Sequence, residues 1–497
     1  MNKNTLCFQQ VTIEDEKAVE ELSALASAIV KEHYDPILGA EQNDYMIEKF
    51  QSVAAIEEQL MHGYQYYFVC PESGEPIGFM GMYQRGSEWY ISKLYLHKDF
   101  RGRGYARQML DFAISLAKKA GTELITLNVN KYNNAVAIYE KLGFERIRDE
   151  VNDIGHGYVM DDYVYALSIR EELKWAVLGT GVIANEMAAA LQKMGKGLYA
   201  VGNRTYDKAV AFAEKYHVQK VYGQIDEMFT DPEVDIIYIT TPHNTHYEFM
   251  KKALENGKHI LVEKSITLNS RELEEMVALA KEKNLVLAEA MTIWHMPIYK
   301  KLWEIAGEGK LGKVQMITLN FGSFKEYNMK NRFFNMDLAG GALLDIGVYA
   351  LSIVRSFMSE TPDQILSQMK PSPAGSDEQA SILLMNPDGQ MASVSLTMHS
   401  RQPKRAMISC EKGYIEIMEY PRADRAVIVD AGSGRSEEVI AGNTEDALFY
   451  EMMDMEWAVR YGRTEEMQLA YTKDVMDIMT GLRKEWGLKY PEEEWDS

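Results

Sequence analysis

Two glycine-containing turns in the sequence have residue types that suit the binding of phosphate groups. The first, Arg101-Gly102-Arg103-Gly104-Tyr105-Ala106, stands between a predicted strand and a predicted helix. Backbone N–H groups at the start of a helix attract a pyrophosphate, and glycine lets the ligand approach the backbone closely. Arg101 and Arg103 add positive charge. An exposed turn has a similar composition, so this pattern alone leaves both interpretations open.

The second turn, Gly179-Thr180-Gly181-Val182-Ile183-Ala184, follows the apolar run Trp175–Leu178 and opens a predicted helix. It has the Gly-x-Gly-x-x-Ala form of dinucleotide-binding folds. In that pattern the first glycine makes a tight turn and the second admits the pyrophosphate, while the small third residue lets the helix pack on the strand. The sequence therefore predicts a nicotinamide dinucleotide site here.

The residues after the second strand of this region bear on the choice of cofactor. An NAD enzyme usually has an acidic residue there, which binds the adenosine ribose. This sequence has Asn203-Arg204-Thr205 instead. Since arginine is the usual partner of a 2′-phosphate, Arg204 favours NADP over NAD. The alternative is that Arg204 is an exposed turn residue.

His243 and His246 are three residues apart, a spacing that occurs in metal sites. A catalytic zinc site generally has three protein ligands, and no third ligand is evident nearby, so we expect no metal. His295 is expected to pack in the core or to face the substrate. Three scattered cysteines predict neither a disulfide framework nor a metal site, and they indicate a reduced, cytoplasmic protein. They are Cys7, Cys70 and Cys410.

The elements around the first turn predict a mixed α/β domain over residues 1–169. The predicted strands cover 66–69, 77–83, 89–96 and 123–129, with two more strands ending near Ile169. The predicted helices cover 22–30, 47–61, 105–120 and 134–142. The charged residues 170–174 lack periodicity and are interpreted as a linker.

The pattern changes after the linker and predicts two further domains. Strand–turn–helix units over 175–294 indicate a Rossmann domain with a doubly wound parallel sheet. Longer strands over 295–497 indicate an α+β domain with a large, mostly antiparallel sheet, whose face is expected to mediate a homo-oligomer. The strands predicted in the Rossmann domain are 175–178, 199–201, 236–240, 259–262 and 285–288. Those predicted in the last domain are 313–324, 379–385, 391–398, 405–417 and 426–429, followed by helices near 445–461 and 472–486.

Length and charge agree with a multidomain soluble protein. The chain has 497 residues, 46% of them hydrophobic, which corresponds to roughly three domains at about 150 residues each. Its formal charge is −21, because 74 Asp and Glu outnumber 53 Lys and Arg. Such an acidic surface repels nucleic acid and anionic lipid. No apolar run reaches the ~18 residues of a membrane span, and Glu14, Asp15 and Glu16 argue against a signal peptide. We expect neither nucleic acid nor membrane as a partner.

The first turn is one of several motifs that, together, resemble the GCN5-related N-acetyltransferase (GNAT) family over roughly residues 4 to 169. Arg101-x-x-Gly104-x-Ala106 is similar to the acetyl-CoA loop of that family. The other matching segments are Lys93-Leu94-Tyr95-Leu96, Asn133-Asn134-Ala135, Tyr139-Glu140-Lys141-Leu142-Gly143-Phe144 and Gly157-Tyr158-Val159-Met160-Asp161-Asp162-Tyr163. Order and spacing agree with the family throughout.

This resemblance implies transfer of an acetyl group from acetyl-CoA to an amine. Backbone donors near Leu94 and Leu96 would polarise the thioester, and Tyr139 would protonate the departing thiolate. Tyr139 has an aromatic packing role as its alternative. Glu88 and Tyr90 are candidates on the acceptor side, and nothing identifies the amine. The implied acetyl-CoA-binding residues are Leu94, Leu96, Arg101, Gly102, Arg103, Gly104, Ala106 and Asn133.

A second series of motifs resembles the Gfo/Idh/MocA oxidoreductases over roughly residues 173 to 490. Within that family it is most similar to the dihydrodiol dehydrogenase and NADP-linked aldose dehydrogenase branch, which has Tyr where other branches have His. The segments, besides the second glycine turn, are Thr240-Thr241-Pro242-His243-Asn244-Thr245-His246, Glu263-Lys264-Ser265, Ala288-Glu289-Ala290-Met291 and Gly340-Gly341-Ala342-Leu343-Leu344-Asp345-Ile346-Gly347-Val348-Tyr349.

This second resemblance implies hydride transfer between a carbinol carbon and nicotinamide. Lys264 and Tyr349 would carry the proton, with Asp345 orienting the substrate or the lysine. Desolvation beside a bound nicotinamide is expected to lower the pKa of Lys264 toward neutrality. Ser265 stands where the family usually has proline. The implied cofactor-binding residues are Gly179, Gly181, Val182, Ile183, Asn203, Arg204, Thr241, Pro242, His246, Glu263 and Lys264.

Three functions follow from these motifs. The first is a bifunctional enzyme, an N-acetyltransferase joined to an NADP-dependent dehydrogenase of a sugar-like, polyol or dihydrodiol alcohol. The second is an oxidoreductase whose first domain only senses acetyl-CoA. The third is a ligand-responsive regulator with a Rossmann domain, which the presence of Lys264 and Tyr349 disfavours.

Overall fold

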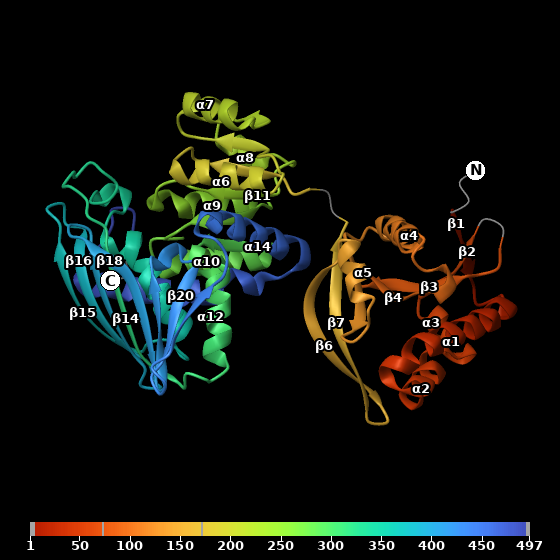
Figure 1. Cartoon of the computed structure of the whole chain (residues 1–497). Coiled ribbons are helices and arrows are strands. Elements are labelled where there is room, and N and C mark those ends of the chain that lie inside the picture. The colour runs from red at the N-terminus through yellow and green to blue at the C-terminus, as the bar shows by residue number, and fades with distance from the viewer. Residues whose placement is uncertain (1–4, 72–73, 170–171, 494–497) are drawn as a thin grey trace. The chain divides into compact units, whose positions relative to one another are not determined.

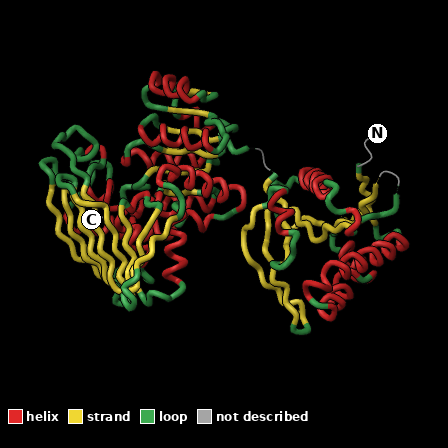
Figure 2. The backbone as a smooth tube through the Cα atoms, viewed as in Figure 1, coloured by secondary structure: helices red, strands yellow, loops and turns green. Residues whose placement is uncertain are grey.

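The structure, a computed structural model, describes residues 5–71, 74–169 and 172–493 (Figures 1 and 2). It divides into two compact units, residues 1–171 and 172–497. The predicted linker covers residues 170–174, and two of them, 170 and 171, lie outside the described residues. Leu173 is buried in the core of the second unit, and the Lys174 backbone N–H donates to Asp235 Oδ2 at 2.8 Å. Residues 173 and 174 therefore pack as part of the second unit.

The first unit is a seven-stranded sheet with helices on both faces (Figure 1). The strand order is β1-β2-β3-β4-β5-β7-β6, and only the β4–β5 pair is parallel. One core contains α1 and α3, and the other contains α4. The strands are β1 (Leu6–Val11), β2 (Gln65–Pro71), β3 (Gly78–Arg85), β4 (Glu88–Leu96), β5 (Leu124–Asn130), β6 (Glu145–Gly155) and β7 (Tyr158–Ser168). The helices are α1 (Glu16–Leu38), α2 (Ala40–Gln51), α3 (Val53–Met61), α4 (Tyr105–Lys119) and α5 (Val136–Lys141).

Two strands of this sheet separate and leave an opening. β4 pairs with β5 only from Glu88–Ile91, opposite Leu124–Leu127. The β3–β4 register shifts between the pairs of Gly81 and Met82, so Ser92 is an extra residue in β4. A bulge of this kind bends a strand away from its neighbour. The second half of β4 therefore leaves β5, and the space between them is available to a ligand.

The prediction of one helix over 47–61 was wrong, because α2 and α3 are separate helices. Ser52 interrupts them with an extended backbone, and its hydroxyl accepts the Ala55 N–H at 3.3 Å. A serine at this position satisfies a free N–H at the start of the second helix. The apolar periodicity continues across the interruption and conceals it.

The second unit begins with a six-stranded parallel sheet in the order β10-β9-β8-β11-β12-β13. This is the classic Rossmann order, with the first strand at the centre. Leu178, Ile239 and Val262 lie in register across β8, β11 and β12, so the loops after these strands lie next to one another at the carboxyl ends of the strands. The strands are β8 (Trp175–Leu178), β9 (Ala200–Gly202), β10 (Lys220–Val221), β11 (Ile236–Ile239), β12 (His259–Glu263) and β13 (Leu287–Ala290). The helices are α6 (Val182–Lys193), α7 (Tyr206–Tyr216), α8 (Asp226–Thr230), α9 (His246–Glu255) and α10 (Ser270–Glu282).

The unit continues into an eight-stranded sheet in the order β15-β16-β17-β14-β18-β19-β20-β21. Its neighbouring strands are antiparallel except for β14 and β17, as the prediction of a mostly antiparallel sheet required. The strands are β14 (Val314–Gly322), β15 (Gln364–Pro371), β16 (Asp377–Met385), β17 (Met391–Thr397), β18 (Gln402–Cys410), β19 (Gly413–Met418), β20 (Arg425–Asp430) and β21 (Ser436–Ile440). The helices are α11 (Thr292–His295), α12 (Pro297–Gly307), α13 (Val348–Phe357), α14 (Ala447–Tyr461) and α15 (Leu469–Trp486).

Some strands of this last sheet were predicted differently. The single strand predicted over 405–417 is two strands, β18 and β19, because the chain reverses at Glu411 and Lys412. β15 and β21 were not among the predicted strands, and neither was β10 in the Rossmann sheet. All three strands lie at the edge of a sheet, where both faces are less buried and the sequence alternates less clearly. The predicted fold class of all three regions is nevertheless confirmed.

One apolar helical stretch corrects the prediction about membrane-length segments. Among the described residues, Met336–Phe357 spans 22 residues with a mean hydropathy of 1.5, which is long and apolar enough to cross a membrane. In the fold, 78% of its apolar window is buried. It carries α13, which packs against β14, β17 and α15. Most of this stretch is therefore part of the core, and its α-helix, α13, is apolar because it is buried on several sides.

Candidate active sites

Lys264, directly after β12, contacts the two residues with which it was predicted to act. Its Nζ donates to the backbone oxygen of Asp345 at 2.7 Å and to Asp345 Oδ1 at 3.0 Å. The same nitrogen lies 5.1 Å from the centroid of the Tyr349 ring. The peptide bond between Lys264 and Ser265 is cis, and Ser265 Oγ donates to the Leu344 carbonyl at 3.0 Å. The lysine loop is thus bonded to the segment that carries Asp345 and Tyr349.

Asp345 and Tyr349 come from one continuous helical segment. Asp345 lies in a short π-helical turn, Leu343–Gly347, and Tyr349 lies at the start of α13. Turns of this kind often occur at functional sites, because the wider turn redirects side chains. Residues four apart on such a segment face the same side, so both side chains point toward Lys264.

The pKa values of these three groups depend on their contacts with one another as well as on burial. Burial alone would lower the pKa of Lys264, but attraction to Asp345 and Tyr349 outweighs it, and the pKa lies above its ordinary value. Burial would raise the pKa of Asp345, yet Lys264 and Arg332 hold it below its ordinary value. Burial raises the pKa of Tyr349 to about 12. At neutral pH the protein therefore presents an ammonium and a neutral phenol, both of which can donate a proton.

The two histidines, His243 and His246, contact backbone carbonyls of the loop that carries Lys264. His243 Nε2 lies 3.0 Å from the Lys264 carbonyl, and burial lowers the pKa of His243 to about 3. His246 is fully buried, with its ring nitrogens 3.0 Å from the Ser265 carbonyl and 2.9 Å from the Thr241 carbonyl. The buried ring of His246 thus holds the two loops together. Within residues 5–71, 74–169 and 172–493, no group of three or more His, Cys, Asp or Glu could hold a metal.

The Gly179 turn has the geometry that a pyrophosphate requires. Gly179 has a φ of +110°, and a Cβ there would lie 2.5 Å from Thr240 Oγ1, so only glycine fits. Gly181 caps α6 without a side chain, and a Cβ added to it meets nothing within 4 Å. Val182, the first residue of α6, is 75% exposed. The backbone amides at the start of α6 are therefore accessible to a phosphate group.

The other predicted cofactor residues lie near the same carboxyl ends of the Rossmann strands. Arg204 is exposed after β9, and the Asn203 side chain donates to the Thr205 carbonyl at 2.9 Å. Glu263 accepts a 2.5 Å hydrogen bond from Tyr238, and burial raises the pKa of Glu263. The remaining predicted positions are exposed or half-buried: Ile183, Thr241 and Pro242.

The first unit contains a cavity of about 380 Å³ where β4 leaves β5. Gly102 and Gly104 have φ values of +76° and +81°, which glycine adopts readily. Arg103 donates to the Asp99 carbonyl at 2.8 Å and covers the Phe100 ring, and it is not among the residues that line the cavity. The predicted acetyl-CoA residues that line the cavity are Leu94, Leu96, Arg101, Gly102, Gly104, Ala106, Asn133 and Tyr139.

Several residues of this cavity were not predicted from the sequence. His33 and Tyr34, in α1, contact Asn133 through hydrogen bonds of 3.2 Å and 3.1 Å. They are about 100 positions away from Asn133 in the chain, and no local motif signals them. Burial raises the pKa of Tyr139, which keeps its hydroxyl protonated. The cavity therefore contains a neutral phenol of the kind that a general acid needs.

The predicted acceptor-side residues are already engaged within the protein. Glu88 Oε2 accepts from Arg85 at 3.0 Å and from Thr126 at 2.8 Å. Tyr90 donates to Asn128 Oδ1 at 3.3 Å. Asp162, which belongs to a family motif but was given no role, is buried, and burial raises its pKa to about 6. Its Oδ2 has no hydrogen-bond partner among the residues that the structure describes.

The second unit has a glycine turn and a lysine at the carboxyl ends of parallel Rossmann strands, and the lysine lies beside the segment that leads into α13. These features define a dinucleotide-dependent oxidoreductase. Comparisons with known proteins identify it further. Residues 173–291 match the "Oxidoreductase family, NAD-binding Rossmann fold" and residues 299–416 match the "GFO/IDH/MocA C-terminal domain". Residues 34–160 match the "Acetyltransferase (GNAT) domain". The chain therefore combines a GNAT domain with both domains of the Gfo/Idh/MocA oxidoreductase family.

Relatives and solved structures cover the second unit. The trans-1,2-dihydrobenzene-1,2-diol dehydrogenase of Xenopus laevis is 29% identical over 329 residues, which are 64% of this chain and 99% of the relative. The 3-ketoreductase KijD10 from Actinomadura kijaniata, solved with NADP and TDP-benzene, aligns with a TM-score of 0.56 and 20% identity, over 63% of this chain and 98% of that one. UDP-N-acetylglucosamine 3-dehydrogenase GnnA from Acidithiobacillus ferrooxidans also gives a TM-score of 0.56 at 20% identity, over 64% and 99%. These two structures share the fold of the second unit.

Proposed function

We propose that the second unit is an NADP-dependent dehydrogenase or reductase acting on a hydroxyl group of a sugar, polyol or dihydrodiol. The observation that carries this proposal is the contact of Lys264 with Asp345 and Tyr349 at the same sheet edge as the Gly179 turn. Adjacent strands are about 4.8 Å apart, so the turn after β8 and the lysine after β12 are about 10 Å apart. A nicotinamide dinucleotide bridges such a distance easily. The Xenopus laevis relative is a dihydrodiol dehydrogenase, an activity of the same reaction class.

The residues of this site have separate roles in the proposed reaction. Bound NADP(H) supplies or accepts the hydride. Lys264 and Tyr349 transfer the proton at the substrate oxygen, and Asp345 orients the Lys264 ammonium through the 3.0 Å contact. Because the pKa of Lys264 is raised by its partners and that of Tyr349 by burial, both groups are protonated at neutral pH. They are therefore set to protonate a carbonyl oxygen and to receive that proton again in the opposite direction.

A panel of alcohols tests this proposal. The purified chain is incubated with NADP⁺ or NAD⁺ and aldoses, polyols or trans-1,2-dihydrobenzene-1,2-diol, and nicotinamide absorbance is followed. We expect turnover with NADP⁺ and a KM for NADP⁺ about 10-fold below that for NAD⁺, the effect of one charge-assisted hydrogen bond. Arg204→Ala is expected to remove this difference and to leave the KM for NAD⁺ unchanged. Absence of turnover with every alcohol and both cofactors would contradict the proposal.

For the first unit we propose an acetyl-CoA-dependent N-acetyltransferase. The cavity of about 380 Å³ between β4 and β5, whose lining includes Arg101, Gly102 and Gly104, supports this function. Glycine φ values and the start of α4 suit the pyrophosphate of coenzyme A. Bound acetyl-CoA supplies the acetyl thioester. Tyr139 holds the proton that the departing thiolate needs.

Thiol release separates this proposal from the sensor alternative. Acetyl-CoA is offered together with a panel of primary amines, including amino sugars, and free thiol is measured. We expect release that depends on the amine and is saturable. Binding of acetyl-CoA by calorimetry without amine-dependent release would favour a sensing domain instead.

A further inference from the structure

The segment that carries Asp345 and Tyr349 is fixed at its start by an acid from the large sheet. Asp377, the first residue of β16, is fully buried, and its Oδ2 accepts the Leu343 N–H at 2.5 Å. Its other oxygen, Oδ1, has no hydrogen-bond partner in the described part of the chain. Asp377 therefore acts as a cap on the π-helical turn Leu343–Gly347.

Gly341 lets this acid approach so closely. Its φ is +143°, a backbone conformation that side-chain-bearing residues rarely adopt. A Cβ added at this position would collide with Asp377 Oδ1. The carboxylate thus lies against the backbone immediately before the turn that carries Asp345.

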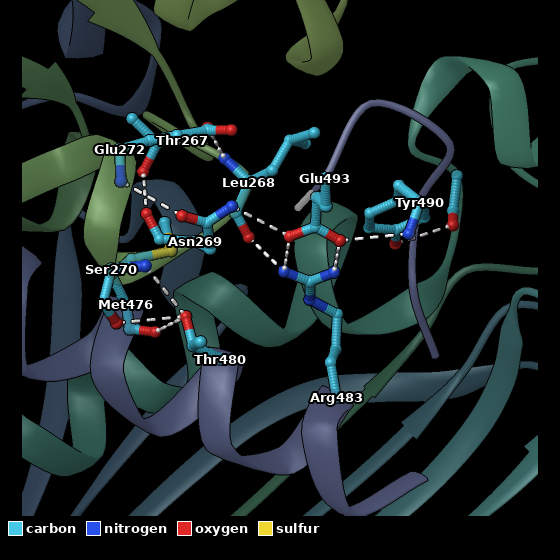
Figure 3. A network of polar contacts seen from close by, with 11 residues as sticks. Thr267, Leu268, Asn269, Ser270, Glu272, Met476, Thr480, Arg483, Tyr490 and Glu493 are labelled. Atoms are coloured by element: carbon cyan, nitrogen blue, oxygen red, sulfur yellow. Dashed lines mark hydrogen bonds and ion pairs between the residues drawn. The ribbon is translucent and has the colours of Figure 1, made fainter. Parts of the chain in front are cut away.

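The last described residues of the chain hold the same segment from another side. Tyr490 is fully buried, and its hydroxyl donates to the Gly340 carbonyl at 3.0 Å. The Tyr490 N–H donates to Glu493 Oε2 at 3.0 Å. Arg483, in α15, forms two hydrogen bonds with the Glu493 carboxylate, of 2.6 Å and 2.7 Å (Figure 3). We refer to Arg483, Tyr490 and Glu493 together as the C-terminal clasp.

The C-terminal clasp also holds the loop that follows Lys264. Arg483 donates to the Leu268 carbonyl, and the Asn269 side chain donates to Glu493 Oε1 at 3.0 Å (Figure 3). Leu268 and Asn269 follow Lys264 by four and five residues. One buried network therefore contacts both segments that meet at the Lys264–Asp345 pair.

We propose that Asp377 and the C-terminal clasp are positioning residues that set the distance between Lys264 and the segment carrying Asp345 and Tyr349. Neither element touches the reacting atoms. Each fixes backbone on one side of the site, and reactive groups held in place need no rearrangement during the reaction. The inference rests on the proposed oxidoreductase function for its kinetic test, and on the contacts alone for its structural test.

Tyr490→Phe is the main variant, because it removes one hydrogen bond without unpairing a buried charge. Its matched control is Tyr222→Phe, since Tyr222 is also buried and its hydroxyl donates to Asp231 at 2.6 Å, away from the candidate site. With NADP⁺ and trans-1,2-dihydrobenzene-1,2-diol as the probe, we expect Tyr490→Phe to lower kcat about 10-fold. KM values and the NADP⁺ dissociation constant are expected to stay within about 2-fold, and the melting temperature to fall no more than in the control.

Asp377 gives an independent pair of variants. Asp377→Asn keeps an oxygen that can accept the Leu343 N–H, and we expect it to retain kcat within about 2-fold. Asp377→Ala removes the acceptor and is expected to lower kcat about 10-fold. A purely structural role would lower the melting temperature of both variants without separating their kcat values.

Hydrogen–deuterium exchange of the full chain keeps the inference testable without turnover. We expect the amides of residues 340–349 to exchange faster in Tyr490→Phe than in the wild type, and Tyr222→Phe to leave them unchanged. Unchanged exchange of residues 340–349, or a kcat equal to that of the control variant, would overturn the inference. If the wild type oxidises no alcohol while exchange rises as expected, the proposed function fails and the clasp is supported.

Discussion

Replacement of Lys264 by methionine is expected to lower kcat of the alcohol–carbonyl reaction about 1,000-fold. Methionine has a similar length but carries no proton, so the substrate oxygen loses its donor and Asp345 loses the partner at 3.0 Å. The dissociation constant for NADPH is expected to change less than about 2-fold, because in the proposed site the pyrophosphate is bound by the Gly179 turn and not by Lys264. Steady-state kinetics and fluorescence titration with NADPH measure the two effects separately.

The control for this prediction is a second buried lysine in the same domain. Lys258 is 5% exposed, and its Nζ donates to the Val234 carbonyl at 2.8 Å. Lys258→Met is expected to lower thermal stability but to keep kcat within about 3-fold per folded molecule, since Lys258 and Lys264 lie at opposite ends of β12. Turnover of Lys264→Met within 10-fold of the wild type would exclude Lys264 from the proton path.

The pH dependence of the reduction rate is a second test of the role of Lys264. Asp345 and Tyr349 raise the pKa of Lys264 above its ordinary value, against the effect of burial. The ammonium form is therefore complete at neutral pH and is lost only as the pH rises through this raised pKa. Carbonyl reduction is expected to be constant through neutral pH and to decline in the alkaline range, as Lys264 loses its proton through its raised pKa and Tyr349 loses its own near a pKa of about 12.

The sequence was sufficient where the signal is local. Both glycine turns, the strands that precede them and the helices that follow are short contiguous patterns, and the structure contains them where they were predicted. The pairing of Lys264 with Asp345 was implied by family resemblance, and the two residues are in contact although 81 positions separate them. Motifs of this kind encode a site because each residue type is required at a fixed place on an element.

The remaining features depend on partners that are distant in sequence. The pKa of Lys264 in the protein alone is raised because Asp345 lies close to it, and no spacing in the sequence reveals that contact. The C-terminal clasp joins Arg483 to Leu268 across 215 positions. Ser52 ended a helix through its own hydroxyl while the apolar pattern continued. Tertiary contacts decide these features, and they override the local pattern.

Replacement of Tyr139 by phenylalanine is expected to lower kcat of acetyl transfer about 100-fold, with the acetyl-CoA dissociation constant within about 2-fold. Phenylalanine keeps the ring that packs against Phe144, at 5.7 Å between centroids, so the variant removes the hydroxyl and preserves the packing. Burial raises the pKa of Tyr139, and this hydroxyl therefore holds its proton until a thiolate forms. Amine-dependent thiol release gives the rate, and calorimetry gives the affinity.

The matched control and the alternative outcome separate an acid from a packing residue. Tyr165 is 2% exposed and its hydroxyl donates to Glu140 at 2.8 Å, so Tyr165→Phe removes a comparable buried hydroxyl in the same unit. We expect it to leave thiol release within about 2-fold. If Tyr139→Phe also released thiol at the wild-type rate, Tyr139 would act only through packing, and water or another donor would have to protonate the thiolate. A rate loss confined to Tyr139→Phe would instead show that acetyl transfer needs the phenol hydroxyl, because this variant and the wild type have the same ring, cavity and coenzyme affinity.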